Sequence, residues 1–502
     1  MPQHSKNLTE GRLLATNVLF SLAGHLFPAL AAIFSIPILI NALGADGFGV
    51  MALAWMVSGY FGLLDLGVGR ALTKLLSEKL GRDDLEDIPD LIWTALMLTA
   101  VVGLVGALGL SLASSTLVDD VLTIPPAMRD EVELSFLILA MSVTIVICNS
   151  AMRGILESYQ RFDLINFVRV PIGSLMFLGP ILVLPFSEKL PYIVGALVLT
   201  RLLELGLNTF FCIRVVPELL KNIRLKHSYV RMFLSFGGWM TISSIIAPLM
   251  TYVDRFLIGT LISLSAIAYY VTSHELITRM RVIPGAIVGV VFPSLASLIG
   301  INSSKVKDIY FSGIKYTFIL VFPIVMIVFI FAREGLSLWL GDEFSLRGTT
   351  VLQLLSVGAL ISSFSYFPFA AMHAAGRPDL TAKLHLIEAP VYIIMAWILI
   401  VRFGIEGAAL AWVLRTIVDS FILFYLAGLE LKINYPVSRI LQIAFIVGAF
   451  LLLSMLLPQE IYFKMGFASI GLFLLFTYSW KKLITADDRR ILLSYTKRLK
   501  LS

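Results

Sequence analysis

Six arginines lie within the hydrophobic stretches of this 502-residue chain, at Arg169, Arg201, Arg255, Arg279, Arg281 and Arg415. A charged side chain at membrane depth costs about 3 kcal/mol, so each arginine needs a partner or a ligand. A guanidinium group can bind a carboxylate or a phosphate at two points, which a lysine ammonium cannot do. The arginines therefore predict a membrane protein whose cationic interior handles an anionic molecule.

Three of these arginines have an acidic residue three or four positions away, on the same face of the expected helix. The pairs are Arg201 with Glu204, Glu275 with Arg279, and Arg415 with Asp419. Two interpretations are open: each pair neutralises itself, or its arginine also contacts a ligand in a shared cavity. On the second interpretation, we predict that the anion-binding residues are Arg169, Arg201, Arg279, Arg415 and Arg255.

Two pairs of an acid and a histidine are candidates for ion coupling. Glu275 follows His274 directly, and Glu388 lies three residues after His385. An acid near a histidine inside a membrane can relay protons, although hydrogen-bonded packing would use the same residues. We predict no catalytic residue, no metal site and no cofactor.

The elements that position these residues are expected to be membrane-spanning helices. The chain is 58% hydrophobic and 14% charged, with a mean hydropathy of +0.90, whereas soluble domains carry about 25% charged residues. Because about 20 apolar residues cross a bilayer core as a helix, we predict an all-α polytopic membrane protein with about 14 spans. These cover residues 13–40, 48–68, 88–114, 132–152, 164–185, 190–213, 232–259, 264–299, 311–332, 349–373, 381–401, 405–428, 440–457 and 461–480.

The distribution of basic residues supports this number of spans. If the N-terminus and every second loop share one side, that side holds 27 of the 39 Lys and Arg residues and the other side holds six. Such an excess marks the cytoplasmic side. We therefore predict a multi-pass inner membrane protein with both termini in the cytoplasm.

A duplication is visible between the two halves of the sequence. Arg169-Val170-Pro171 recurs 219 residues later as Glu388-Ala389-Pro390, and Gly195-Ala196 has a counterpart in Gly407-Ala408. Transporters are often built from such repeats. We predict two pseudo-symmetric six-helix lobes, two added helices and a basic cytoplasmic tail, in residues 1–229, 230–429, 430–480 and 481–502 respectively.

The predicted span 264–299 is longer than a bilayer requires. It either extends into the cytoplasm or bends, and a proline followed by a glycine, Pro284-Gly285, is the natural place for a bend. The sequence leaves these two possibilities open.

Sequence motifs of several other protein classes are missing. The chain has no GxxxxGK[ST] phosphate loop, no HExxH and no GxSxG. Its pI of about 9.1 reflects membrane orientation rather than nucleic-acid binding, because no basic soluble domain is present. The acidic pair Asp83-Asp84 could suggest a sugar-nucleotide site, but we expect it to lie in a solvated loop.

Several loose motifs together resemble the polysaccharide-exporting flippases of the O-antigen type, which share a superfamily with multidrug extruders and lipid II flippases. The resemblance extends to about residue 430. It rests on Pro37, Leu43-Gly44, Phe48-Gly49, Leu64-Asp65-Leu66-Gly67, Tyr252-Val253-Asp254-Arg255, Gly259, Tyr269-Tyr270, Leu338-Trp339-Leu340-Gly341, Ala375-Gly376-Arg377 and Phe403-Gly404-Ile405-Glu406-Gly407.

This resemblance implies two helical bundles with alternating access to a cationic cavity. It also implies export of an undecaprenyl-diphosphate-linked oligosaccharide, an O-antigen or exopolysaccharide repeat unit, to the periplasmic leaflet. The expected partners are that glycan, membrane lipids, a proton or sodium ion, and a polysaccharide polymerase. The alternatives are a multidrug/cation antiporter, disfavoured by the interior arginines, and a membrane polymerase or ligase, disfavoured by the short outer loops.

Overall fold

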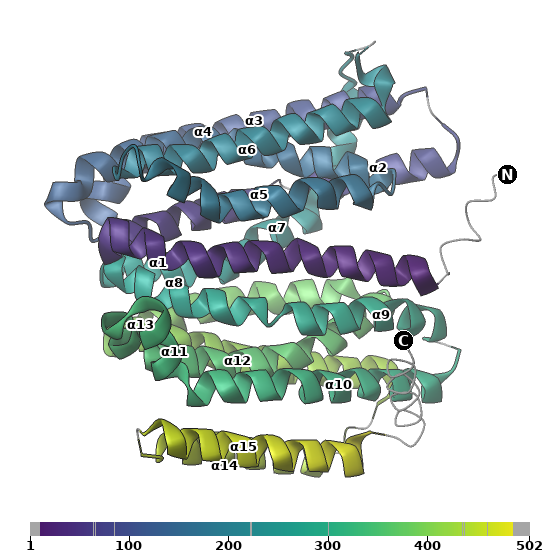
Figure 1. Ribbon diagram of the computed structural model, residues 1–502. Coiled ribbons are helices and arrows are strands. Elements are labelled where there is room, and N and C mark those ends of the chain that lie inside the picture. The colour runs from purple at the N-terminus through teal and green to yellow at the C-terminus, as the bar shows by residue number, and fades with distance from the viewer. Residues whose placement is uncertain are drawn as a thin grey trace, which may run out of the picture. The chain divides into compact units, whose positions relative to one another are not determined.

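The computed structural model describes residues 11–484 except 64, 66, 85, 221–222, 300, 434, 436 and 459, and it leaves undescribed the side chains of 11–26, 63, 234–245, 247–248, 290, 293–294, 297, 437, 439–441 and 482. This part of the chain is helical, with short turns between helices (Figure 1). The α-helices are α1 (Gly11–Leu63), α2 (Val68–Gly81), α3 (Ile88–Thr116), α4 (Arg129–Ser158), α5 (Phe162–Val183), α6 (Leu190–Val215), α7 (His227–Leu261), α8 (Leu264–Arg279), α9 (Val282–Leu298), α10 (Ser303–Ile330), α11 (Ala332–Leu340), α12 (Asp342–Ala374), α13 (Pro378–Leu431), α14 (Val437–Met455) and α15 (Ile461–Tyr478).

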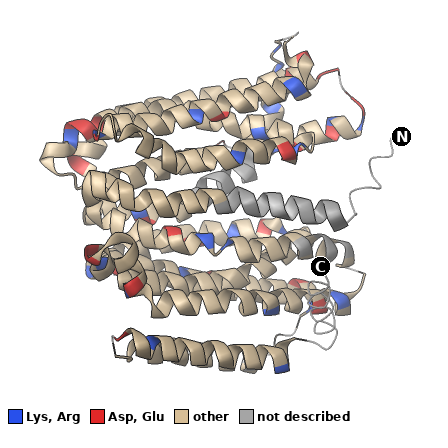
Figure 2. Ribbon diagram, viewed as in Figure 1, with Lys and Arg blue, Asp and Glu red and all other residues tan. Residues whose placement is uncertain are grey.

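The predicted all-α membrane architecture is confirmed. Within the described ranges, nine helices are long and apolar enough to cross a membrane, and Figure 2 shows that charged residues are sparse along them. Two of the nine, α1 and α13, each cover two predicted spans, and in each a glycine with non-helical backbone angles separates the two spans. Gly44 has φ 69° and Gly404 has φ 63°, a left-handed conformation that glycine adopts without strain.

The long predicted span at residues 264–299 is broken into α8 and α9. The span therefore bends, and the break lies at Met280 and Arg281 rather than at Pro284-Gly285, the natural place for a bend in the sequence. A proline ring clashes with the carbonyl group four residues earlier in a helix. Continuation of α8 through Met280 would bring that carbonyl group against Pro284, so α8 ends at Arg279 and Pro284 sits in the first turn of α9.

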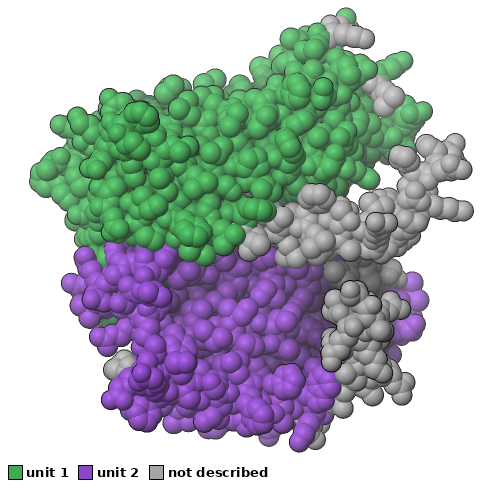
Figure 3. All heavy atoms as spheres, in the orientation of Figure 1, with its two compact units in different colours: residues 1–275, 382–411 green, residues 276–381, 412–502 purple. Residues whose placement is uncertain are grey.

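The chain divides into two compact units, drawn in different colours in Figure 3. Unit 1 comprises Met1–Glu275 and Ala382–Ala411, and unit 2 comprises Leu276–Thr381 and Trp412–Ser502. The division into six-helix lobes at residue 229 stays a prediction. Most of the predicted basic tail, from residue 485 onward, lies outside the described residues.

In unit 1, α3, α4, α5 and α6 pack side by side, and α1 packs against α4 and α5 (Figure 1). The resemblance motifs hold this unit together. Asp65 accepts hydrogen bonds from the backbone N–H groups of Gly67 (2.9 Å) and Gly69 (3.0 Å) at the start of α2 and from the Ser150 hydroxyl (2.9 Å) on α4. Asp46 accepts one from the backbone N–H of Ser265 (2.9 Å) in the first turn of α8. These carboxylates therefore cap helices.

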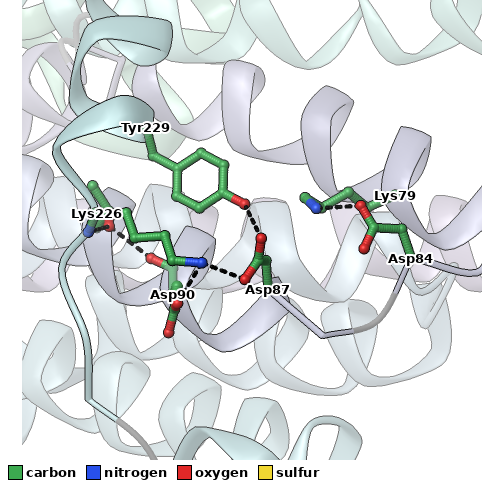
Figure 4. Close-up of polar contacts among 7 residues, drawn as sticks. Lys79, Asp84, Asp87, Asp90, Lys226 and Tyr229 are labelled. Carbon is green, nitrogen blue, oxygen red and sulfur yellow. Dashed lines mark hydrogen bonds and ion pairs between the residues drawn. The ribbon is translucent and has the colours of Figure 1, made fainter.

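A polar clamp fastens the connection between α6 and α7 to the start of α3 (Figure 4). The Lys226 ammonium group pairs with Asp87 and, at 3.0 Å, with Asp90, while the Tyr229 hydroxyl donates to Asp87 at 3.3 Å. The Lys226 hydrogen bond lowers the pKa of Asp87, and the bonds to Asp87 and then Asp90 raise the pKa of Lys226. This clamp is made entirely by unit 1 residues.

The acidic pair in the α2–α3 loop is solvated, as expected. Asp84 pairs with Lys79 at 2.5 Å, and the carboxylate side chain remains half exposed. An acidic group that is held by a neighbouring lysine and open to water is a surface ion pair. Asp84 is therefore part of the loop's surface rather than of a sugar-nucleotide site.

In unit 2, α10 packs against α9, α12, α14 and α15. The buried Lys464 on α15, only 6% exposed, pairs with Glu334 on α11 at 2.6 Å. In the sequence, Lys464 is one of the six basic residues expected on the non-cytoplasmic side of the membrane. It is instead buried because Glu334, 130 residues away in sequence, supplies the opposite charge that a buried ammonium group requires.

Candidate functional site

Arg201 and Glu204 form the ion pair that their spacing predicted. On α6, Arg201 Nη1 lies 2.8 Å from a Glu204 carboxylate oxygen, and Glu204 is buried at 8% exposed. Within the part of the chain that the structure describes, Arg201 Nε has no hydrogen-bond partner. A buried N–H group normally has one. Arg201 therefore neutralises Glu204 and retains a donor for a further acceptor.

Arg169 lies close to this pair. On α5, it interacts electrostatically with Arg153 and Glu157 of α4 and with Glu204 of α6. We call these four residues and Arg201 the α4–α6 charge cluster. Three guanidinium groups here meet two carboxylates, so the cluster carries a net charge of +1 at neutral pH. Such an excess attracts an anion.

Arg255 is placed differently from Arg169, because its guanidinium group is buried and already bonded. The side chain is 5% exposed, its Nη2 lies 3.1 Å from Nδ1 of His274, and it packs over the ring of Tyr252 at 5.1 Å. Next to it, Asp254 accepts the Tyr270 hydroxyl at 2.5 Å. We call Tyr252, Asp254, Arg255, Tyr270 and His274 the α7–α8 network.

The network and the charge cluster lie within electrostatic reach of each other in unit 1. Tyr252 interacts with the charges of Arg201 and Glu275 as well as with Asp254 and Arg255. An additional charge bound at one group therefore changes the energy of the other.

The second predicted pair of an acid and a histidine lies on the part of α13 that belongs to unit 1. A ligand-type atom of His385 lies within 4.8 Å of one from Glu388. Glu388 is buried and His385 is half-buried. The spacing of three residues therefore does bring these two side chains together.

The remaining predicted arginines belong to unit 2. Arg279 ends α8 and Arg415 lies within α13, and both are half-buried. Arg281 follows the α8–α9 break and is exposed, where its Nε donates to the Tyr366 hydroxyl at 3.0 Å. Arg281 thus has an aromatic partner that its position in the sequence does not reveal.

Sequence reasoning missed Arg153, Glu157 and the aromatic members of the network. Arg153 was counted among the cytoplasmic basic residues because it lies just beyond the apolar run 132–152. The available signal was its spacing of four residues from Glu157, which places both on one helical face. That Arg169 shares their surroundings depends on the packing of α4 beside α5.

Chemically, the site can bind and neutralise an anion. Guanidinium groups bind phosphate and carboxylate oxygens through pairs of N–H donors. Two imidazole side chains, His274 and His385, each lie beside a carboxylic acid in the sequence or in space. These are the features of a binding site that could respond to protons.

Comparison with known proteins identifies the family. The pattern of the family described as polysaccharide biosynthesis proteins matches residues 38–347. A Shigella flexneri protein, whose name proposes that it is an O-antigen transporter, is 27% identical over 411 residues, covering 82% of this chain and 96% of that protein. A Haloferax volcanii protein, whose name proposes a low-salt glycan biosynthesis flippase, is 23% identical over 211 residues, covering 42% and 44% of the two chains.

Solved structures share the fold. A lipid II flippase in an inward closed conformation has a TM-score of 0.73 at 15% identity, covering 93% of this chain and 100% of that one. An inward-facing multidrug transporter has a TM-score of 0.69 at 15% identity, covering 83% and 94%. These relatives are named as transporters and flippases rather than as enzymes. With the matched segment spanning more than half of its length, the chain belongs to the family of polysaccharide biosynthesis proteins.

Proposed function

We propose that this protein is a flippase that moves an undecaprenyl-diphosphate-linked oligosaccharide from the cytoplasmic to the periplasmic leaflet of a bacterial inner membrane. The repeat unit of an O-antigen or an exopolysaccharide is the expected glycan. Alternating access is the expected mechanism, with both termini in the cytoplasm. The names of the similar proteins support a glycan cargo, and the excess of basic residues on one side supports the orientation.

The observation that carries this proposal is the net positive α4–α6 charge cluster. The constant anionic part of the proposed cargo is a diphosphate, and diphosphate oxygens match the free Nε donor of Arg201 and the neighbouring Arg169 guanidinium group. We propose that Arg279 and Arg415 of unit 2 bind the same group at other stages of transport. The lipid tail remains in the bilayer throughout.

Energy would come from a proton or sodium gradient or from the membrane potential. The candidate coupling residues are His274 with Glu275 and His385 with Glu388. The contact between His385 and Glu388 supports the second pair. A polysaccharide polymerase that consumes the exported repeat unit is the proposed protein partner.

A multidrug/cation antiporter of the same fold is the rival function. A cationic cargo would be repelled by a cluster in which arginines outnumber acids. Resistance to cationic drugs, measured with and without the protein, tests this rival directly.

Export in cells that carry single variants tests the proposal. Arg169→Gln and Arg201→Gln remove a charge from the cluster, and Arg402→Gln removes an exposed arginine elsewhere on the chain. We expect the first two variants to lose surface polysaccharide and the third to keep it, at equal amounts of protein in the membrane. If all three export equally well, the cluster does not bind the cargo.

A further inference from the structure

The hydrogen bond between Arg255 and His274 joins α7 to α8 in the membrane interior. Both side chains are 5% exposed, and the His274 ring also stacks on Tyr270 at 5.9 Å. Nη2 of Arg255 and Nδ1 of His274 are 3.1 Å apart. This contact links a charged side chain of α7 to a titratable side chain of α8.

The chemistry of the two groups fixes the protonation state of His274 in this contact. A guanidinium group has five N–H donors and no acceptor. Nδ1 of His274 must therefore accept, which leaves the imidazole neutral with its proton on Nε2. A second proton on the ring would place an N–H on Nδ1, directed at a cation 3.1 Å away. The bond and a protonated His274 are mutually exclusive.

We propose that the Arg255–His274 bond is a proton-sensitive latch: it is closed while His274 is neutral, and proton uptake at His274 separates α7 from α8. As a coupling device for transport, the latch rests on the proposed flippase function. It assigns the coupling ion as a proton and gives Arg255 a role distinct from that of Arg169 and Arg201.

The groups around His274 indicate that His274, rather than a neighbouring residue, takes up the proton. Helix α7 contributes Tyr252, Asp254 and Arg255, and α8 contributes Tyr270 and Glu275. Two residues of other helices, Arg201 of α6 and Tyr392 of α13, also interact electrostatically with members of the network. Asp254 is 1% exposed and already accepts from both Tyr270 and the Arg255 backbone N–H (2.8 Å). Tyr252 and Tyr270 are phenols, which ordinarily titrate near pH 10. His274 is therefore the member of the network that can both accept a hydrogen bond from Arg255 and take up a proton in its place.

The two residues of the latch can each be replaced by glutamine with different consequences. In His274→Gln, the amide oxygen still accepts from Arg255 but cannot take up a proton. In Arg255→Gln, the amide can donate to a neutral imidazole or accept from a protonated one, so the contact survives protonation. Both variants keep a hydrogen bond between the helices, and both are expected to be insensitive to pH.

Amide hydrogen exchange of the full-length protein in lipid nanodiscs tests the latch without any cargo. Between about pH 7.5 and pH 4.5, an interval that extends below the range of a solvated histidine because burial and the Arg255 charge both oppose a second proton on His274, we expect exchange in 252–279 to rise roughly tenfold after correction for the intrinsic rate. His274→Gln and Arg255→Gln should abolish this rise. His373→Gln, which removes an exposed histidine, and Glu275→Gln should preserve it.

Two results would overturn the proposal. One is an unchanged exchange profile of the wild-type chain across this pH interval, and the other is a rise that persists in His274→Gln. Loss of the rise in Glu275→Gln alone would assign the proton to that acid instead and would equally refute the latch. The exchange measurement needs no glycan. A negative exchange result would therefore refute the latch without refuting the flippase proposal. Unchanged export in the arginine variants would refute the cargo site without affecting the exchange result.

Discussion

Removing Arg201 alone should lower stability much more than removing it together with Glu204, whereas both changes should impair export. Their ion pair is 2.8 Å long, with side chains 20% and 10% exposed. Breaking a buried pair by deleting one partner costs about 3–5 kcal/mol, because the other charge is left uncompensated. Arg201→Ala should therefore lower the melting temperature markedly, whereas Arg201→Ala with Glu204→Ala should recover most of that loss.

Export separates the two interpretations that the sequence leaves open. If Arg201 also binds the diphosphate, the stable double variant still lacks the donor and should export poorly. Thermal unfolding in detergent and surface polysaccharide in cells, measured on the same three proteins, give both quantities. Restored export in the double variant would show that Arg201 serves only to neutralise Glu204, and the binding role of the charge cluster would be refuted.

Three further predictions concern the framework. Lys226→Met should lower the melting temperature slightly because Asp87 and Asp90 lose their cation, and Lys226→Arg is the milder control. The pKa of Lys226 is raised, so its contribution to the free energy of unfolding is complete below the ordinary lysine pKa and is lost as pH rises through the raised value. The pKa of Asp87 is lowered, so its contribution is complete above the ordinary aspartate pKa and is lost as pH falls through the lowered value. The clamp should thus be insensitive to pH between roughly 5 and 10 in unfolding assays. Asp65→Ala should cost about 2 kcal/mol through loss of the α2 cap, and an unchanged melting temperature would contradict that role. Gly49→Ala would place a methyl group 2.1 Å from a backbone oxygen and should cost at least about 3 kcal/mol, whereas Gly109→Ala, with open space around it, should be tolerated.

The helical architecture follows from the sequence because long apolar runs leave no other structure for a chain in a bilayer. The pairing of Arg201 with Glu204 was also predictable, since three residues nearly complete a helical turn. The position of the α8–α9 break at Met280 could have been predicted from the clash of Pro284 with the carbonyl group four residues earlier.

Contacts between distant helices could not be predicted from one sequence. Lys464 was expected among the basic residues of the non-cytoplasmic side, and its burial depends on Glu334, which lies on another helix. Arg153 was expected among solvated basic residues, and its interaction with Arg169 depends on how α4 and α5 pack. The resemblance motif around Asp65 gave no hint that the carboxylate caps α2. In each case the partner is set by tertiary packing rather than by spacing along the chain.

The central claim is that this protein carries a lipid-linked glycan across the membrane. The most direct test is the leaflet position of the undecaprenyl-linked glycan in cells depleted of the protein. The account predicts that the glycan accumulates on the cytoplasmic face while surface polysaccharide is lost. Normal appearance of the lipid-linked glycan on the periplasmic face, in cells shown to lack the protein, would contradict it.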